Sequence, residues 1–346
     1  MTDSIPPSAP ISRSSLYVAA GRAIGAREPD PAARNPDDLV ERLLGDPASL
    51  GIDHPAVQAL SKSYDEAMSE MEVVNVVRMM MIRTRFIDDA LQRAIAGGAT
   101  QMLVLGAGFD THAYRFRDQL THVRVFEVDR PATQAFKRQR VCDVLGEPPV
   151  NLTYVPIDFQ HENLAEVLAR HGYDREQRTF FILEGVTMYL SAEAVSHTLR
   201  FVGSHPPGST IALDFVYEPM VAMLAQLDIT RVPAASRPYV QRFLDVFKDE
   251  PWTFGIPVHK EREFLAEYGL ELRDALMIGG EESLKRYVTK ADGTQVGAQT
   301  IATAMMRIRD QIQASGDAEM QARMSPERMQ EQQRLMAYHI AEAVVS

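Results

Sequence analysis

The stretch QMLVLGAGFDTHAYRF, residues 101–116, decides the fold of this chain. An apolar run ends in Gly106-Ala107-Gly108, and an acidic residue follows at Asp110. A short apolar run that ends in glycine is typical of a strand and a tight turn, where the backbone can approach a ligand closely. The stretch therefore predicts a nucleotide-binding loop after a strand, and it leaves open which nucleotide binds there.

Four more apolar runs follow this one, and helical patterns separate them. The runs cover residues 123–129, 152–158, 179–185 and 209–216. Strands that alternate with helices are typical of a doubly wound parallel sheet, and such sheets bind ligands at the carboxyl ends of their strands. The sequence therefore predicts an α/β fold with the glycine loop at the ligand-binding edge.

The regular alternation ends after the fifth run. Residues 218–260 are too long for a simple crossover, so we expect a helical insertion that covers the site. Beyond it, the patterns predict a helix over 261–269, a strand over 270–278 and a last strand over 299–309. The tail over 325–345 has apolar residues at helical spacing, which predicts a helix.

These patterns divide the chain into three parts. We expect an N-terminal tail and helical cap over residues 1–80, a core with its lid insertion over 81–308, and a C-terminal helical tail over 309–346. The first residues lack the apolar core of a signal peptide, and the single cysteine, Cys142, suits a reducing compartment. We therefore expect a cytoplasmic protein.

Composition and charge argue against several classes of partner. Of the 346 residues, 45% are hydrophobic and 24% are charged, which is ordinary for a globular protein. No apolar run approaches the roughly 20 residues of a membrane span, and no His/Cys cluster has metal-ligand spacing. The net charge of −11 argues against a general nucleic-acid surface. We expect a small-molecule substrate, with no membrane, nucleic acid or metal, and a homodimer stays open.

The glycine loop is a poor match to loops that bind phosphates. A dinucleotide fingerprint has a third glycine where this chain has Thr111, and Asp110 would place negative charge beside a pyrophosphate at a helix N-terminus. The chain also lacks the Gly-Lys-Ser/Thr of a Walker loop. A nucleoside without phosphates remains, and S-adenosylmethionine fits this requirement. An NAD-dependent oxidoreductase is the rival interpretation.

Acidic residues stand at the ends of the second and third strands. Asp129 is the first choice to accept hydrogen bonds from ribose hydroxyls, and Glu127 is the second. Asp158 could accept a hydrogen bond from the adenine amino group, with Phe159 beside it, or it could cap a helix. These residues extend the predicted ligand site along the edge of the sheet.

Glu184 ends the fourth strand, which the sequence predicts to be buried. A lone carboxylate is costly in such a place, so a cationic partner is expected. Either the ammonium group of the ligand or an arginine such as Arg83 would serve.

Six segments, in order, resemble one known family: RTRFIDD, VLGAGFDTHAYRF, FEVDRP, VPIDF, LEGVTMYL and LDFV. Over about residues 16–306 the chain resembles the leucine carboxyl methyltransferase family. Within it, the chain is similar to the bacterial S-adenosylmethionine-dependent O-methyltransferases, which include the tetracenomycin carboxyl methyltransferase. The resemblance implies the class I methyltransferase fold, a Rossmann-like, doubly wound, seven-stranded sheet with one antiparallel strand near the edge. A helical N-terminal cap and a helical insertion after the fifth strand would cover the pocket.

The resemblance also implies roles for individual residues. Arg83 would pair with the methionine carboxylate, because a guanidinium matches a carboxylate fork. Asp129 would hold the ribose, and Glu184 would flank the methionine moiety. Asp110 matches the family as well, and it would either contact the ligand or orient the loop. The cofactor-binding residues implied in this way are Arg83, Gly106, Ala107, Gly108, Asp110, Glu127, Asp129, Asp158, Phe159, Glu184 and Gly185.

The acceptor decides whether the reaction needs a base. A carboxylate is already ionised at pH 7, whereas a phenol, with a pKa of about 10, benefits from a general base. No histidine occupies an obvious acceptor position directly after the fourth strand, where Met188 and Tyr189 lie. We therefore favour a methyl ester of a small apolar or aromatic acid, with a phenolic hydroxyl as the alternative acceptor. Catalytic residues stay unassigned, with Tyr189 and His259 as candidates. The predicted substrate pocket consists of Met188, Tyr189, Tyr217, Met223, Tyr239, Trp252 and Phe254.

Overall fold

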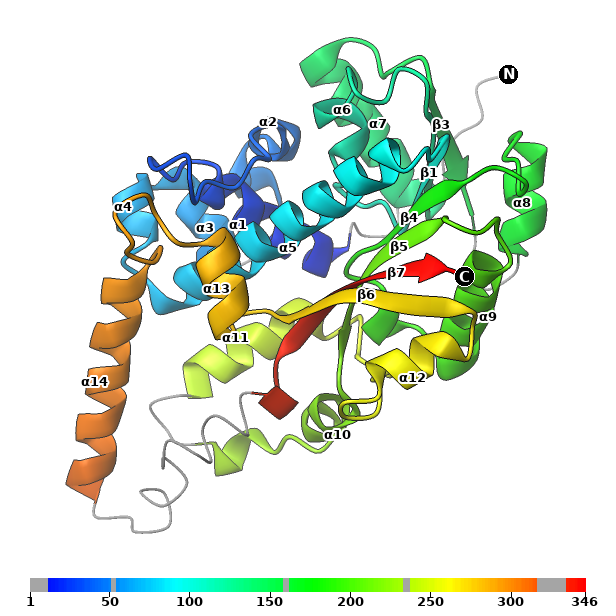
Figure 1. The fold of residues 1–346 in the computed structure, drawn as a ribbon. Helices are drawn as coiled ribbons and strands as arrows, with labels where there is room; N and C mark the ends of the chain where they lie inside the picture. The colour runs from blue at the N-terminus through cyan, green and yellow to red at the C-terminus, as the bar shows by residue number, and fades with distance from the viewer. Residues whose placement is uncertain (1–11, 51–53, 158–161, 233–236, 316–333) are drawn as a thin grey trace.

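A seven-stranded sheet forms the centre of the structure, a computed structural model that describes residues 12–50, 54–157, 162–232, 237–315 and 334–346. Its strands are β1 (Gln101–Leu105), β2 (Arg124–Asp129), β3 (Leu152–Pro156), β4 (Thr179–Leu183), β5 (Thr210–Val216), β6 (Leu270–Met277) and β7 (Tyr338–Val345). The order across the sheet is β3-β2-β1-β4-β5-β7-β6 (Figure 1).

The pairing of the strands confirms the predicted fold class. The neighbours among β1 to β5 are parallel, and β7 is antiparallel to both β5 and β6. Every residue of β1, β4 and β5 is buried, because helices cover both faces of the sheet. Strands buried on both faces appear in a sequence as continuous apolar runs, which is why the first five were predicted correctly.

Helices form a layer on each face of the sheet (Figure 1). One core cluster joins the sheet to α1, α2, α5, α7 and α13, and the other joins it to α8, α9 and α12. None of the helices in the described part of the chain is long and apolar enough to cross a membrane. The helices are α1 (Arg13–Gly25), α2 (Leu39–Leu44), α3 (Pro55–Gln58), α4 (Tyr64–Ala67), α5 (Met71–Ala96), α6 (His112–Arg115), α7 (Pro131–Leu145), α8 (Leu164–Arg170), α9 (Ala192–Gly203), α10 (Glu218–Ala225), α11 (Arg237–Phe247), α12 (Glu261–Ala266), α13 (Glu281–Tyr287) and α14 (Ala298–Ser315).

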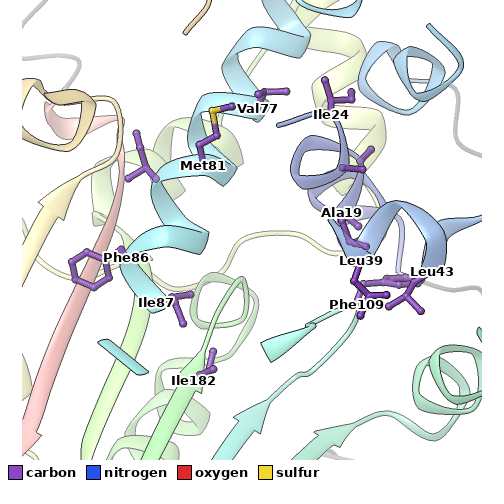
Figure 2. Packing of buried hydrophobic residues seen from close by; sticks show 14 of the residues in the cluster. Ala19, Ile24, Leu39, Leu43, Val77, Met81, Phe86, Ile87, Phe109 and Ile182 are labelled. Carbon is purple, nitrogen blue, oxygen red and sulfur yellow. The ribbon is translucent and has the colours of Figure 1, made fainter. Parts of the chain in front are cut away.

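The long helix α5 connects the N-terminal cap to the sheet. Its side chains Val77 and Met81 belong to the same buried cluster as Ile24 of α1, and Ile87 belongs to this cluster with Ile182 of β4 (Figure 2). Apolar residues at this helical spacing form one stripe, so α5 buries one face along its length. The helix thereby holds its middle residues at the edge where the parallel strands end.

The insertion after β5 is helical, as the sequence predicted. It contains α10, the short 3-10 helix η4 (Ile229–Arg231) and α11. α11 packs against α1, and Phe247 of α11 lies edge-to-face with Tyr17 of α1, with ring centroids 6.0 Å apart. The insertion and the N-terminal cap therefore meet above the carboxyl edge of the sheet.

Two predictions near the C-terminus were wrong. The segment predicted as a last strand, 299–309, lies within helix α14, which extends away from the sheet (orange in Figure 1). Of the tail predicted as a helix, residues 325–333 lie outside the described residues, and the rest contains β7, which runs between β5 and β6. Seven of the eight residues of β7 are buried, so the strand shows no alternation of apolar and polar residues. A short buried run of this kind cannot be distinguished from a helix by periodicity, and alanine and methionine favour the helix in α14.

This correction predicts which of two apolar residues matters for stability. Ile340 in β7 is fully buried, whereas Met306 in α14 is 58% exposed. We expect Ile340→Ala to lower the free energy of unfolding by about 2–5 kcal/mol, because it leaves a cavity in the core. The matched change Met306→Ala should cost less than about 0.5 kcal/mol. Denaturant unfolding measures both, and the reverse order would contradict the placement of β7.

Candidate functional site

A cavity of about 1500 Å³ lies at the carboxyl edge of the sheet, under the insertion. Its walls come from the loops after β1, β2 and β4, from α1 and α5, and from the insertion and the segment that follows it. Parallel strands bring the loops at their carboxyl ends together, so residues far apart in sequence meet here. This cavity is the candidate ligand site.

The glycine loop after β1 forms one wall of the cavity. Gly106 and Gly108 have φ angles of 73° and 42°, which glycine adopts without a Cβ clash. A Cβ on Gly106 would lie only 2.6 Å from Cγ2 of Val186, so the loop and the chain after β4 could not approach as they do. Phe109 packs in the same core cluster as Leu39 of α2 and fixes the loop from behind (Figure 2).

Asp129 ends β2 and also lines the cavity. Its carboxylate accepts backbone hydrogen bonds from Gly108 at 2.5 Å and from Arg130 at 2.6 Å. Burial raises its pKa above the ordinary value, although both hydrogen bonds oppose this change. Each carboxylate oxygen has two lone pairs, so Asp129 can still accept hydrogen bonds from a ligand.

Arg83 of α5 lies between two carboxylates. Its Nε is 2.6 Å from Oε1 of Glu184, and its Nη1 donates a 2.9 Å hydrogen bond to Oδ2 of Asp214. The sequence left two cationic partners open for Glu184, the ammonium group of a ligand and an arginine. In the structure its partner is Arg83. Burial alone would lower the pKa of Arg83, but the two carboxylates raise it above its ordinary value. Its Nη2 makes no hydrogen bond within the described residues, so this nitrogen is available to a ligand in the cavity.

Asp214 was present in a quoted segment, but the sequence analysis gave it no role. It lies in β5 with its side chain fully buried, and its Oδ1 accepts a 2.7 Å hydrogen bond from the backbone N–H of Gly185. Burial raises its pKa to about 6, although Arg83 acts to lower it. The argument applied to Glu184, that a buried carboxylate needs a cation, would have identified Asp214 too.

Asp110 faces the cavity with part of its surface, but its carboxylate is paired with protein groups. Oδ2 of Asp110 is 2.6 Å from Nδ1 of His112, whose Nε2 is 3.0 Å from Asp88. Asp88 in turn accepts two hydrogen bonds from Arg115. Burial tends to raise the pKa of Asp110, but His112 outweighs this and lowers it. The network orients the glycine loop from below.

Glu127 does not line the cavity. Its side chain is buried, and Oε2 accepts a 2.7 Å hydrogen bond from Nζ of Lys137 in α7. Burial raises its pKa to about 7, against the influence of Lys137. Asp158 and Phe159, the predicted adenine contacts, lie outside the described residues.

Aromatic rings line the other end of the cavity, which we call the acceptor chamber. Trp252, after α11, is its centre, and four rings lie across it at steep angles. The centroid distances to Trp252 are 5.2 Å for Tyr338, 5.6 Å for Phe247, 6.3 Å for Phe243 and 6.4 Å for Tyr189. The rings of the acceptor chamber are Tyr17, Tyr189, Tyr239, Phe243, Phe247, Trp252 and Tyr338.

Three of the predicted pocket residues, Tyr189, Tyr239 and Trp252, line the chamber, and the other four do not. Met188 is fully buried in a cluster with Trp252, and α10 contributes Met220 to the cavity in place of Met223. The structure thus separates the predicted pocket into residues that line the cavity and residues that support it.

The remaining predicted residues lie on the other side of β5. The hydroxyl of Tyr217 donates a hydrogen bond to Glu261, and the ring of His259 packs against Tyr217 at 5.7 Å. Phe254 packs against Phe264 at 5.9 Å. His259 does not line the cavity, so the structure does not support it as a base.

Four of the chamber rings, Tyr17, Phe243, Phe247 and Tyr338, were not in the predicted substrate pocket. Tyr17 is on α1, and Tyr338 begins the strand that was predicted as a helix. A strand prediction for 338–345 would have placed Tyr338 at the ligand edge, whereas nothing in the pattern around Tyr17 indicated the cavity. Within the described ranges no group of His, Cys, Asp and Glu side chains could hold a metal ion.

The fold and the site together define a class of protein. The seven-stranded sheet has its antiparallel strand beside the edge strand, the glycine loop follows β1, and a carboxylate ends β2. These are features of S-adenosylmethionine-dependent methyltransferases, and the comparisons with known proteins agree.

The model of the leucine carboxyl methyltransferase family matches residues 15–203, more than half of the chain. The chain belongs to this family and is an S-adenosylmethionine-dependent methyltransferase.

Several known proteins are similar to this chain in sequence or in structure. A protein of Mycolicibacterium vanbaalenii named "Putative S-adenosyl-L-methionine-dependent methyltransferase" is 30% identical over 300 residues, which cover 78% of this chain and 91% of that protein. A Bacillus subtilis protein of the same description is 29% identical over 219 residues, 60% of this chain and 71% of that protein. The crystal structure of a DUF574 family protein from Streptomyces avermitilis aligns with a TM-score of 0.45 and 18% identity, covering 88% of this chain and 97% of that chain.

The network below the glycine loop predicts a specific loss of stability at high pH. Burial would lower the pKa of His112, but Asp110 and Asp88 raise it from 6.5 to about 9. Protonated His112 therefore stabilises the folded state fully below pH 6.5, and this stabilisation is lost as the pH rises through about 9. At about 1.4 kcal/mol for each pKa unit, the free energy of unfolding should fall by about 3 kcal/mol over this window.

Denaturant unfolding between pH 6 and pH 10 checks this expectation. The fall should persist in His122→Gln, which changes an exposed histidine, and should be absent from His112→Gln. An NMR titration of the folded protein gives a second measurement. A His112 ring that titrates near 6.5 would contradict the network.

Proposed function

We propose that this methyltransferase transfers its methyl group to the carboxylate of a small apolar or aromatic acid and forms a methyl ester. The observation that carries the proposal is the acceptor chamber, whose walls are mostly aromatic rings. The nearby carboxylate of Glu250 accepts hydrogen bonds from Ser12 and Ser14 and is paired with Arg130. Pockets with apolar walls and a few polar groups suit small apolar ligands. Such a chamber beside the predicted cofactor site favours an acid with a flat or oily body.

The cofactor supplies a methyl group on a positively charged sulfonium. The glycine loop can approach its amino-acid part closely, because Gly106 and Gly108 carry no side chain. We assign Asp129 to the ribose hydroxyls, since its carboxylate has unused lone pairs at the cavity wall. Nη2 of Arg83 is the donor for the methionine carboxylate, and Glu184 with Gly185 flanks the same end. These features fit S-adenosylmethionine and include no phosphate-binding group.

The described residues around the chamber include no buried, unpaired base, which supports a carboxylate acceptor. Asp249 is exposed to solvent, and Glu250 accepts hydrogen bonds from Ser12 and Ser14. Among the described residues that line the cavity, the one histidine is His197, and it belongs to α9 on the opposite face of the sheet from α5. Asp214 and Glu184 are both paired with Arg83. A carboxylate needs no base at pH 7, whereas a phenol with a pKa of about 10 would have to lose a proton.

The balance of charge also favours a carboxylate. An oxygen–methyl bond forms as the sulfur–methyl bond breaks, the sulfonium becomes a neutral thioether, and the carboxylate becomes a neutral ester. Opposite charges attract strongly where water is excluded. The rings around Trp252 exclude water from this end of the cavity, so they favour the meeting of these two charges. Positioning two bound reactants can supply a further several kcal/mol, on the order of 7–11 in favourable cases.

A panel of aromatic and aliphatic acids and matching phenols, assayed with methyl-labelled cofactor, tests the proposal. We expect label to enter at least one acid and to be released by mild alkali, because esters hydrolyse under these conditions and aryl ethers do not. Alkali-stable label in the phenols, with none in the acids, would contradict a carboxylate acceptor.

Two glycine variants provide a matched control for this assay. Gly106 and Gly269 have nearly equal φ angles, 73° and 72°, so alanine strains both positions alike. A Cβ on Gly269 meets nothing within 4 Å, whereas one on Gly106 collides with Val186 in the cavity wall. We expect Gly106→Ala to lose most methyl transfer and Gly269→Ala to keep it. Equal activity in the two variants would separate the glycine loop from the reaction.

A further inference from the structure

The antiparallel strand β7 brings a C-terminal residue to the ligand edge of the sheet. The parallel strands end at this edge, so an antiparallel strand must begin there. Tyr338, the first residue of β7, pairs with Val216, the last residue of β5. Tyr338 also lies outside residues 15–203, the range that the family model matches.

The register of β7 places Tyr338 on the face of the sheet that carries α5. Side chains alternate along a strand, so Tyr338 and Ile340 share one face, and Ile340 belongs to the core cluster that includes α5. Asp214 of β5 pairs with Ile340 and contacts Arg83 of α5 on this face. Tyr338 is therefore next to the group that we assign to the methionine end of the cofactor.

The ring of Tyr338 is packed, but its hydroxyl is not used. The ring lies edge-to-face with Trp252, with centroids 5.2 Å apart at 89°. Its hydroxyl makes no hydrogen bond to any residue that the structure describes, although Tyr338 lines the cavity. Tyr338 is half-buried, and its hydroxyl is not among the fully buried atoms without a partner, so the hydroxyl is accessible to a ligand in the cavity.

The other tyrosines of the chamber are less suited to hold an anion near the cofactor. Burial raises the pKa of Tyr189, and the negative charge of Glu250, which accepts a hydrogen bond from Ser14, adds to this and would repel a carboxylate. The surroundings of Tyr17 include Glu72, whose negative charge contributes to raising the pKa of Tyr17 and would repel a carboxylate. Asp214 also acts to raise the pKa of Tyr338, but the positive charge of Arg83 acts in the opposite direction there, and no cation among the described residues acts in this way on Tyr17.

No lining cation within the described ranges is free to take a carboxylate. Arg22 is paired with Asp37 and with the carbonyl of Phe109, and Arg130 is paired with Glu250. Arg83 is held by two carboxylates, and its remaining nitrogen is assigned to the cofactor. The carboxylate of an acceptor must therefore be oriented by a neutral donor.

We propose that the hydroxyl of Tyr338 donates a hydrogen bond to the carboxylate of the acceptor and makes the chamber selective for acids; this inference rests on the proposed function. The donor would hold one carboxylate oxygen and leave the other free to attack the methyl group. Burial raises the pKa of Tyr338 well above its ordinary value, with further contributions from Tyr189 and Asp214. The hydroxyl therefore stays protonated and remains a donor throughout the working pH range.

The chain contains one tryptophan, and it lies in the acceptor chamber, so its fluorescence reports directly on occupancy. The protein is loaded with S-adenosylhomocysteine, and benzoate and phenylacetate are titrated against the emission of Trp252. Benzamide and phenylacetamide, of similar shape but without charge, are titrated in parallel. We expect the acids to bind more tightly than their amides.

Tyr338→Phe keeps the ring and removes the donor. Acid binding should weaken about 10- to 100-fold, the effect of losing one hydrogen bond to a charged group, while amide binding changes less than about threefold. The affinity for S-adenosylhomocysteine should be unchanged, which also shows that the variant is folded. The matched control Tyr217→Phe removes a hydroxyl outside the cavity and should leave all these values as they are.

Three outcomes would overturn the inference: equal weakening of acids and amides in Tyr338→Phe, unchanged acid binding in that variant, or no response of Trp252 to any acid. If the variant does not fold, the wild-type protein still decides, because equal affinity for acids and amides would remove the selective donor. Tyr338→Phe could lose acid binding selectively while the methyl label enters only phenols. This result would retain Tyr338 as the donor and would reject ester formation. The two proposals can therefore fail separately.

Discussion

The buried contact of Arg83 with Glu184 and Asp214 is the interaction on which the site depends. The three side chains come from α5, β4 and β5, and each is at most 11% exposed. Isolated charges in such a place would cost several kcal/mol each, so the three groups must stay together. The contact fixes the middle of α5 to the ends of two strands. It also leaves Nη2 of this cavity-lining arginine without a hydrogen bond among the described residues.

The rest of the cavity is arranged around this fixed point. The glycine loop and Asp129 form one wall of the cavity, and the loop is supported from below by the network of Asp110 and His112. The insertion and β7 add the rings of the acceptor chamber. The predicted cofactor end is polar and consists of loops at the ends of the parallel strands. The chamber is aromatic, and many of its rings come from the insertion and β7, which interrupt the alternation of strands and helices. This division sets a polar end of the cavity against an aromatic end.

The sequence was sufficient to predict the parts of the fold that rest on local signals. Strands covered by helices appear as apolar runs. β1, β4 and β5 are buried along their whole length, and the runs at β2 and β3 were recognised with them, so β1 to β5 were predicted. β7 was not predicted. It is covered on both faces and contains two alanines, so apolar and polar residues do not alternate along it. Its place between β5 and β6 depends on tertiary pairing, which a pattern within the segment does not contain. For the same reason Tyr338 could not be found.

The site residues, too, could be predicted where local position decides their place and not where tertiary packing does. Residues next to strand ends, such as Asp129 and the glycine loop, were placed correctly at the cavity wall because topology alone puts them there. Glu127 was predicted in the ligand site but does not line the cavity. Lys137 of helix α7 lies against it, and the two side chains form a buried ion pair. Residues of the insertion were uncertain because its helices show which positions are apolar but not which face meets the cavity. Met223 and Phe254 were predicted on composition and lie elsewhere.

The central claim is that Arg83, held by two carboxylates, presents one nitrogen to the cofactor. A crystal structure of the complex with S-adenosylhomocysteine tests it most directly. The account predicts a carboxylate oxygen of the ligand about 3 Å from Nη2 of Arg83, with Glu184 and Asp214 still on Nε and Nη1. A ligand carboxylate bound elsewhere, or an Arg83 side chain that leaves its two partners, would contradict it.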